Sequence, residues 1–250
     1  MAQASPRSTV EAAVKPISRR PGSSAPWPLN LYASAVGKKW VMAITGIIGM
    51  GFITMHMLGN LKIYLGAEEL NHYAEGLRTF GAPLAPREAI LWILRSVLLV
   101  SLVLHVHAAF SLWSANRRAR PVAYASQRDY IAANWASRTM KWTGPLILWF
   151  IFMHLMDLTW GAYNADFIHG DVYHNVVALF SSAPKVIVYV LANVALGVHL
   201  WHGAWSLFQS IGVNNPYLNG IRRVFATVFA LAIVAGNVSF PIAVFLGIVS

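Results

Sequence analysis

The chain has 250 residues, of which 57% are hydrophobic and only 11% are charged, and its mean hydropathy is +0.53. These values exclude a disordered chain and an ordinary soluble domain, and they are typical of a helical protein that crosses a membrane several times. There is no cysteine, so any iron–sulfur cluster would have to take its thiolates from another chain, and histidine becomes the obvious metal ligand.

The N-terminal segment, residues 1–36, is rich in Ser, Pro, Ala and Arg and has no apolar core. Because a secretory signal needs such a core, we do not expect a signal peptide here. The composition predicts a polar, basic cytoplasmic tail that is followed by a membrane domain over residues 37–250.

Five apolar segments follow the tail, and each has the roughly 20 residues needed to cross about 30 Å of hydrocarbon. Backbone polar groups inside a bilayer must be satisfied within their own segment, so we expect helices. The sequence therefore predicts an all-α membrane protein, a bundle of five transmembrane helices. The expected spans are 39–61, 89–114, 140–162, 185–211 and 221–249. Pro145 is expected in the N-terminal turn of the third span, and Pro241 at a kink in the fifth.

The positive charge of the chain, +10, lies mainly in the tail and in the loops between apolar segments. Fourteen of the 19 Lys and Arg residues belong to the tail and to every second loop, whereas four belong to the loops that alternate with them. This asymmetry places the N-terminus in the cytoplasm and the C-terminus outside. We therefore expect a multi-pass protein of the inner (cytoplasmic) membrane that has no nucleic-acid partner.

Each of the first four spans contains a histidine at a matching depth: His56, His105, His154 and His199. An ionisable ring at membrane depth is costly, so it indicates function. At a rise of 1.5 Å per residue, and with alternating helix directions, His56 and His154 fall in the outer half of the membrane and the other two in the inner half. Two levels of paired imidazoles suit haem iron, whereas zinc would require a tighter cluster.

Two further histidines are alternative ligands. His107 points away from the face of its span that carries His105 and small residues, so His105 is favoured as the ligand. His202 lies one turn from His199 on the same side, where it could replace that ligand or bind a cofactor propionate or a quinone carbonyl. The competing interpretations are interhelical hydrogen bonds for the histidines and plain helix packing for the small residues.

Several motifs resemble a known family. Residues 38–46, 56–61 and 71–74 are similar to the start of the membrane-anchor subunit of succinate dehydrogenase, in the single-chain, five-helix cytochrome b type shared with some fumarate reductases. Residues 199–212 (HLWHGAWSLFQSIG) resemble its fourth helix and form the most specific run. The similarity extends over residues 38–240.

The resemblance implies two b-type haems, an outer one held by His56 and His154 and an inner one held by His105 and His199. One haem, no haem, or an unusual cluster with thiolates from a partner are the alternatives. It also implies that a flavoprotein subunit and an iron–sulfur subunit dock on the cytoplasmic face, and that the succinate-oxidising site lies on another chain. Electrons would then pass to a membrane quinone, often menaquinone in five-helix members.

A quinone site needs hydrogen-bond donors near the membrane surface. The candidates on the inner side are His202, Trp205, Ser206, Gln209 and Arg120, and those on the outer side are Asn60, Asp157 and Tyr73. For each of them, interfacial anchoring or helix capping is the competing interpretation. Three other functions also compete: a fumarate reductase anchor, the cytochrome b subunit of another dehydrogenase, and a transporter with a histidine relay, which would be expected to show internal repeats and broken helices.

Overall fold

Helices form the whole regular structure of the computed structural model, which describes residues 26–119, 135–213 and 215–250. No β-strand occurs in those ranges. Four segments are long and apolar enough to cross a membrane: residues 35–65, 89–118, 183–210 and 216–245. The prediction of an all-helical chain with several membrane spans is confirmed for the described residues.

The long helices follow the expected spans in order. They are α2 (Ala35–Asn60), α4 (Ala89–Arg118), α5 (Trp135–Leu158), α7 (Ala183–Ser210) and α8 (Asn219–Phe245). Helix α5 is not among the four candidate spans. It carries Lys141 near its beginning and both His154 and Asp157 near its end, which lower its hydropathy. A fifth span therefore stays a prediction.

The ends of α5 differ from the expected third span, 140–162. The helix begins at Trp135, so Pro145 lies inside it, and the prediction that this proline marks an N-terminal turn was wrong. Hydropathy locates the apolar stretch of a helix, whereas backbone hydrogen bonding continues through flanking polar residues. The helix ends at Leu158, and Gly161 shortly after it has a φ of 69°, a left-handed conformation that glycine adopts readily.

Three shorter helices lie outside the expected spans. Helix α1 (Trp27–Ala33) falls within the segment expected as a tail, whereas α3 (Ala67–Thr79) and α6 (Val172–Phe180) occupy the two loops that were expected on the outer side. Asp171 directly precedes α6, and its side chain accepts a hydrogen bond from the backbone N–H of His174 and thereby caps the helix. The hydropathy pattern had not separated these helices from the loops.

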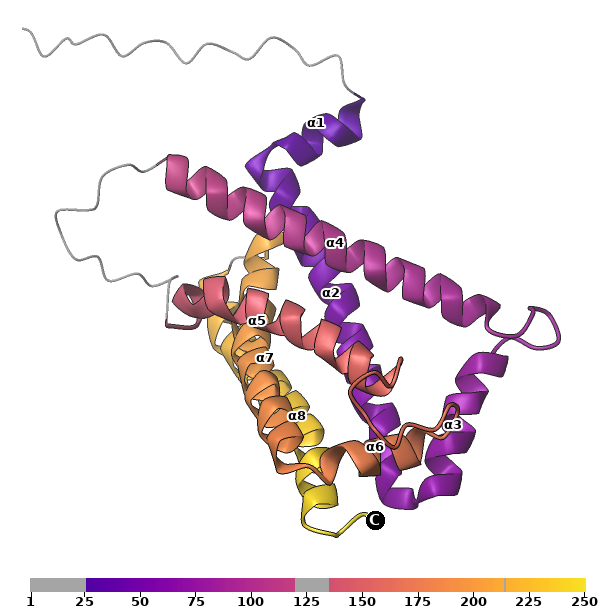
Figure 1. Cartoon of the computed structure of the whole chain (residues 1–250). Helices are drawn as coiled ribbons and strands as arrows, with labels where there is room; N and C mark the ends of the chain where they lie inside the picture. The colour runs from indigo at the N-terminus through magenta and orange to yellow at the C-terminus, as the bar shows by residue number, and fades with distance from the viewer. Residues whose placement is uncertain (1–25, 120–134, 214) are drawn as a thin grey trace, which may run out of the picture.

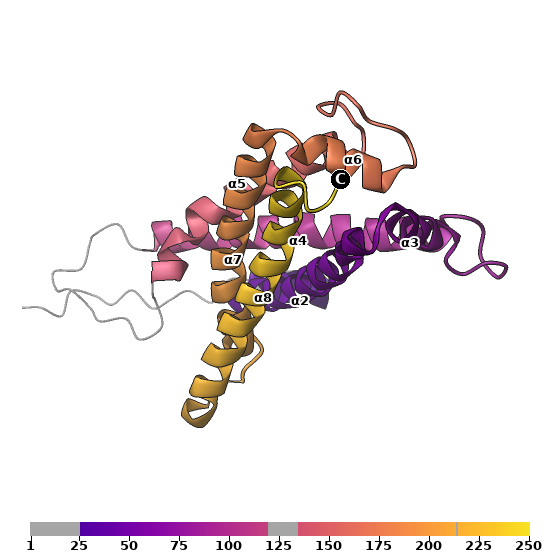
Figure 2. The same cartoon turned by 90° about the horizontal axis from the view of Figure 1, so that it is seen from below.

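The long helices pack as two groups that meet along α2. Helices α7 and α8 run side by side and α5 lies across α7, while α4 crosses α2 and α3 packs beside α6 at one end of the molecule (Figures 1 and 2). Glycine permits the closest approaches: a Cβ at Gly197 would collide with Val234 of α8, and one at Gly236 would collide with Met57 of α2. Small residues at helix crossings are typical of membrane bundles.

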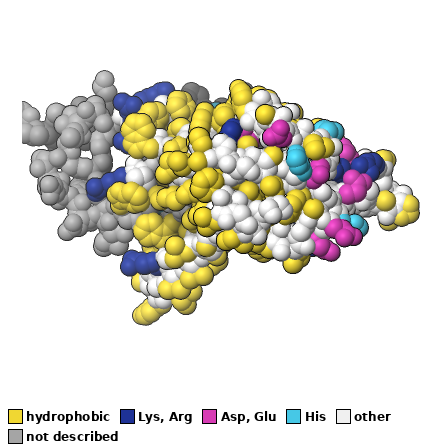
Figure 3. Space-filling model, turned by 60° about the horizontal axis from the view of Figure 1, so that its bottom comes forward, with side chains coloured by type: hydrophobic (Ala, Val, Ile, Leu, Met, Phe, Trp, Pro, Cys, Tyr) yellow, Lys and Arg dark blue, Asp and Glu magenta, His cyan; other side chains and the backbone are white. Residues whose placement is uncertain are grey.

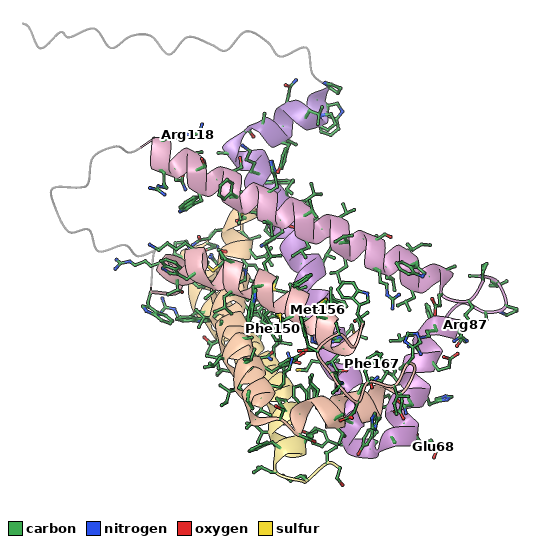
Figure 4. The ribbon with its side chains drawn as sticks, viewed as in Figure 1. Glu68, Arg87, Arg118, Phe150, Met156 and Phe167 are labelled. Carbon is green, nitrogen blue, oxygen red and sulfur yellow. The ribbon has the colours of Figure 1, made fainter. Side chains whose placement is uncertain are left out.

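Charge is divided between the two ends of the molecule. On the face shown in Figure 3, Lys and Arg alone carry charge at one end, whereas Asp and Glu gather at the other end, where some basic residues also lie. Figure 4 marks Arg118 at the basic end of α4 and Glu68, at the start of α3, at the acidic end. The apolar surface of α4 and α8 lies between these ends, as a hydrocarbon layer requires.

Candidate functional site: two histidine pairs

The four span histidines lie together as two pairs. On α4 and α7, the rings of His105 and His199 have their centres 6.4 Å apart and their planes inclined by 53°. On α2 and α5, the rings of His56 and His154 have their centres 5.8 Å apart and their planes perpendicular. Each helix of the four thus contributes one ring to one pair.

These separations fit two imidazoles that bind one metal ion from opposite sides. A metal–imidazole bond is about 2.0–2.1 Å long and the ring centre lies about 1 Å beyond the nitrogen, so the two ring centres would be about 6 Å apart. No group of three or more His, Cys, Asp or Glu side chains occurs among the described residues. A donor set of only two histidines suits haem, because the porphyrin supplies the remaining four nitrogens.

The surroundings of the pairs leave room for a flat group. The closely packed helix pairs are α7 with α8, α2 with α4, and α5 with α7. Helices α4 and α7, which carry one histidine pair, do not pack closely on each other, and neither do α2 and α5, which carry the other. His56 is exposed and the other three rings are only half-buried. A Cβ added at Gly46 on α2 would lie 3.8 Å from Cε1 of His105 and would meet no other atom within 4 Å. Protein side chains therefore do not close the space beside the rings.

We call His105 and His199, which were expected in the inner half of the membrane, the inner pair, and His56 and His154 the outer pair. Each ring of the inner pair has a threonine hydroxyl beside its Nδ1. Thr45 Oγ1 on α2 lies 3.0 Å from Nδ1 of His105, and Thr143 Oγ1 on α5 lies 3.4 Å from Nδ1 of His199. Both hydroxyls also bond to backbone carbonyls of their own helices. Both threonines are buried.

The outer pair has different neighbours. Nδ1 of His154 is buried and has no hydrogen-bond partner in the part of the chain that the structure describes. Its ring packs between aromatic rings, with Phe150 of its own helix (labelled in Figure 4) at 5.9 Å and Tyr189 of α7 also at 5.9 Å between centres. The Tyr189 hydroxyl donates a 3.0 Å hydrogen bond to Asp157, which also pairs with Lys185 at 2.5 Å. Asp157, an expected outer quinone candidate, is therefore occupied by two protein partners.

The alternative ligands His107 and His202 are not members of either ring pair. His107 is exposed on α4, and its Nδ1 lies 2.5 Å from the hydroxyl of Tyr32 on α1. His202 is half-buried on α7, and its Nδ1 has no hydrogen-bond partner among the described residues. His107 thus joins α1 to α4, whereas His202 keeps a free ring nitrogen inside the bundle.

The remaining inner candidates gather at one end of α7. The Trp205 ring lies 4.5 Å from the guanidinium of Arg222 and 5.7 Å from that of Arg223, both on α8. Ser206 donates to the carbonyl of Gly203, and Gln209 is exposed. Arg120 lies outside the described residues. Of the outer candidates, Tyr73 packs against Gly59 and Asn60 ends α2.

The sequence analysis counted Arg222 only among the basic loop residues and did not predict that it is buried. It is only 2% exposed, and it donates to the Val213 carbonyl and to Asn219. Its Nε and Nη2 have no partner in the described part of the chain. Burial of this residue depends on how α7 packs on α8, which no local pattern indicates.

The two threonines carried a signal that the sequence analysis overlooked. Thr45 precedes His56 by eleven residues, and Thr143 precedes His154 by eleven residues. Eleven residues make about three helical turns, so each threonine shares a face with the histidine of its own helix. The two segments also match as Thr-Gly at their beginning and Phe-Ile and Met-His further on, over residues 45–56 and 143–154.

Comparison with known proteins gives the family. The model of the family described as succinate dehydrogenase/fumarate reductase transmembrane subunit matches residues 116–238, from the end of α4 into α8. No curated protein and no solved structure matches the chain. With several apolar helices and this match, the chain is a multi-pass membrane protein. It belongs to the succinate dehydrogenase/fumarate reductase transmembrane subunit family.

Proposed function

We propose that this chain is the cytochrome b anchor of a succinate:quinone oxidoreductase, with five spans, a cytoplasmic N-terminus and an outer C-terminus. The observation that carries the proposal is the arrangement of four histidines as two pairs, at 6.4 Å and 5.8 Å between ring centres. Each pair bridges helices that are not packed closely against each other. Family membership supplies the context of a respiratory complex.

The histidine pairs would hold two b-type haems. His105 and His199 would bind the inner one and His56 and His154 the outer one, and haem bound there would supply one-electron transfer. The protein's part is to orient the imidazoles and to exclude water. Small residues that leave open space, such as Gly49 and Gly203, support a flat ligand beside the rings.

The basic end of the molecule would face the cytoplasm and dock an iron–sulfur subunit, itself bound to a flavoprotein that oxidises succinate. The excess of Lys and Arg in the N-terminal tail and in the loops at that end supports this orientation. It brings the inner pair, rather than the outer one, closer to the docked subunit. The position of the inner pair would therefore suit the first membrane acceptor of electrons.

A quinone head group would bind near the same end, at His202, Trp205, Ser206 and Gln209, with Arg120 as a further candidate. The free Nδ1 of His202 supports this placement, because a buried ring nitrogen without a partner is costly until a ligand satisfies it. Menaquinone is the quinone that we propose, on the resemblance to five-helix anchors. The same anchor could also serve fumarate reduction.

Purification of the complex through a tag on this chain tests the proposal. We expect a reduced-minus-oxidised spectrum with b-type bands, two haems per chain, and copurification of a flavoprotein and an iron–sulfur protein. Assays of succinate oxidation and fumarate reduction with menaquinone and ubiquinone analogues then assign direction and quinone. A complex that copurifies with both partners but has no b-type band would refute the haem assignment and leave the anchor role in place.

A further inference from the structure

We infer that Thr45 and Thr143 are positioning residues for the inner cofactor: each accepts a hydrogen bond from Nδ1 of one inner histidine and so presents that ring's Nε2 to the metal. The inference rests on the proposed function, because it concerns residues behind the two inner ligands. It adds two helices, α2 and α5, to a site whose ligands come from α4 and α7.

The direction of the hydrogen bond at His105 follows from the other contacts of Thr45. A threonine hydroxyl has a single hydrogen and two lone pairs. Thr45 Oγ1 donates to the Val41 carbonyl at 2.6 Å, so its hydrogen is already used. Towards Nδ1 of His105, 3.0 Å away, the oxygen must therefore accept, which requires the hydrogen on Nδ1. In that neutral tautomer Nε2 carries the free lone pair that a metal binds.

The same argument applies to the second ring. Thr143 Oγ1 donates to the Thr139 carbonyl at 3.3 Å and lies 3.4 Å from Nδ1 of His199. The hydroxyl is again engaged with its own helix, so it accepts from the ring. Each threonine lies eleven residues, about three helical turns, before the outer-pair histidine of its own helix. This equal spacing brings both hydroxyls to the level of the inner pair.

The outer pair has no such support among the described residues. Nδ1 of His154 is buried without a partner, and its neighbours are the rings of Phe150 and Tyr189. The two levels therefore differ in the hydrogen bonds behind their ligands. Such bonds fix ring orientation and raise the basicity of a histidine ligand, which favours the oxidised metal. The threonines should accordingly lower the potential of the inner site relative to a site without them.

Replacement by valine tests the inference, because Thr45→Val and Thr143→Val keep the side-chain shape and remove the hydroxyl. The readouts are a redox titration and the ferric low-spin EPR signals of the purified complex, in which the outer signal serves as an internal reference. We expect each variant to raise the inner potential and shift the inner signal alone. The affinity of the complex for the inner haem should fall by roughly 10-fold to 100-fold.

Two controls accompany these variants. Thr45→Ser keeps the hydroxyl and should restore the wild-type potential and signal. Thr54→Val removes a hydroxyl that makes the same kind of bond to its own helix, to the Met50 carbonyl at 2.8 Å, and it should leave both signals unchanged.

The possible outcomes separate this inference from the proposed function. A wild-type complex without haem signals would refute the haem assignment itself. Haem-loaded valine variants with an unshifted inner signal, or a serine variant that behaves like valine, would overturn the inference alone. Loss of both haem signals together would show that the threonines are needed for folding, and this result would also overturn the inference.

Discussion

The hydroxyl of Tyr32 lies 2.5 Å from Nδ1 of His107, and the two rings stack with their centres 5.8 Å apart. This contact joins the short helix α1 to α4. It gives the second histidine of α4 a partner outside the bundle, while His105 faces His199 inside it.

The two histidines of α4 should therefore differ sharply when they are replaced. We expect His105→Ala to abolish the inner haem signal and to leave the outer one, because only His105 lies opposite His199. His107→Ala should keep both haems and loosen α1. Haem quantification and EPR on the purified complexes measure this difference, and loss of a haem in the His107 variant alone would contradict the assignment.

The Asp157–Lys185 pair predicts an asymmetry in stability. Asp157 is 1% exposed, whereas the Lys185 side chain is 25% exposed and can return to water. Removal of one partner from a buried pair costs about 3–5 kcal/mol when the other charge stays buried. Lys185→Met should therefore lower the thermal stability of the solubilised complex more than Asp157→Asn does. The double variant should recover part of the loss, and equal losses in the two single variants would contradict the argument.

The close approach of α7 to α8 predicts a strong dependence on Gly197. A Cβ there would collide with Val234, a branched side chain with little freedom to move, so Gly197→Ala should destabilise by about 1–3 kcal/mol through overpacking. Gly220→Ala on α8 is the matched control, because its Cβ would meet no atom within 4 Å. Thermal unfolding in detergent compares the two, and equal stability would show that the helices are less tightly packed.

The cap of α6 predicts that the stability of this helix depends on pH. The backbone N–H of His174 and then the amide of Asn71 hold the pKa of Asp171 below its usual range. A lowered folded pKa means that the stabilisation is present at neutral pH and is lost as the pH falls through that value. After correction for the intrinsic exchange rates, which themselves fall with pH, the protection factors of the α6 amides should therefore decrease at acidic pH.

Two variants separate the charge of Asp171 from its capping role. Asp171→Asn keeps a capping oxygen and should remove most of the pH dependence, whereas Asp171→Ala should cost about 1 kcal/mol at neutral pH. The cost of Asp171→Ala should shrink at acidic pH, where the wild type has itself lost the stabilisation by the carboxylate. Protection factors in the asparagine variant that still fall on acidification would assign the effect to another group.

The match between expectation and structure was best for properties that depend on a single segment. Apolar lengths placed all five long helices, but hydropathy misjudged the start of α5, and with it the place of Pro145, because a helix continues beyond its apolar stretch. The short helices α3 and α6 escaped notice because they are polar or brief. The span directions, by contrast, were enough to predict which histidines would share a level.

The sequence by itself determined that this is a helical membrane protein with histidines in four of its five expected spans, because burial in a bilayer restricts composition residue by residue. Only the tertiary structure decided what lies behind those histidines. Thr45 meets His105 across 60 positions of the chain, and Lys185 reaches Asp157 across 28. Such contacts depend on the rotation and crossing of whole helices, which are set by the packing of many small contacts together and not by any one stretch of sequence.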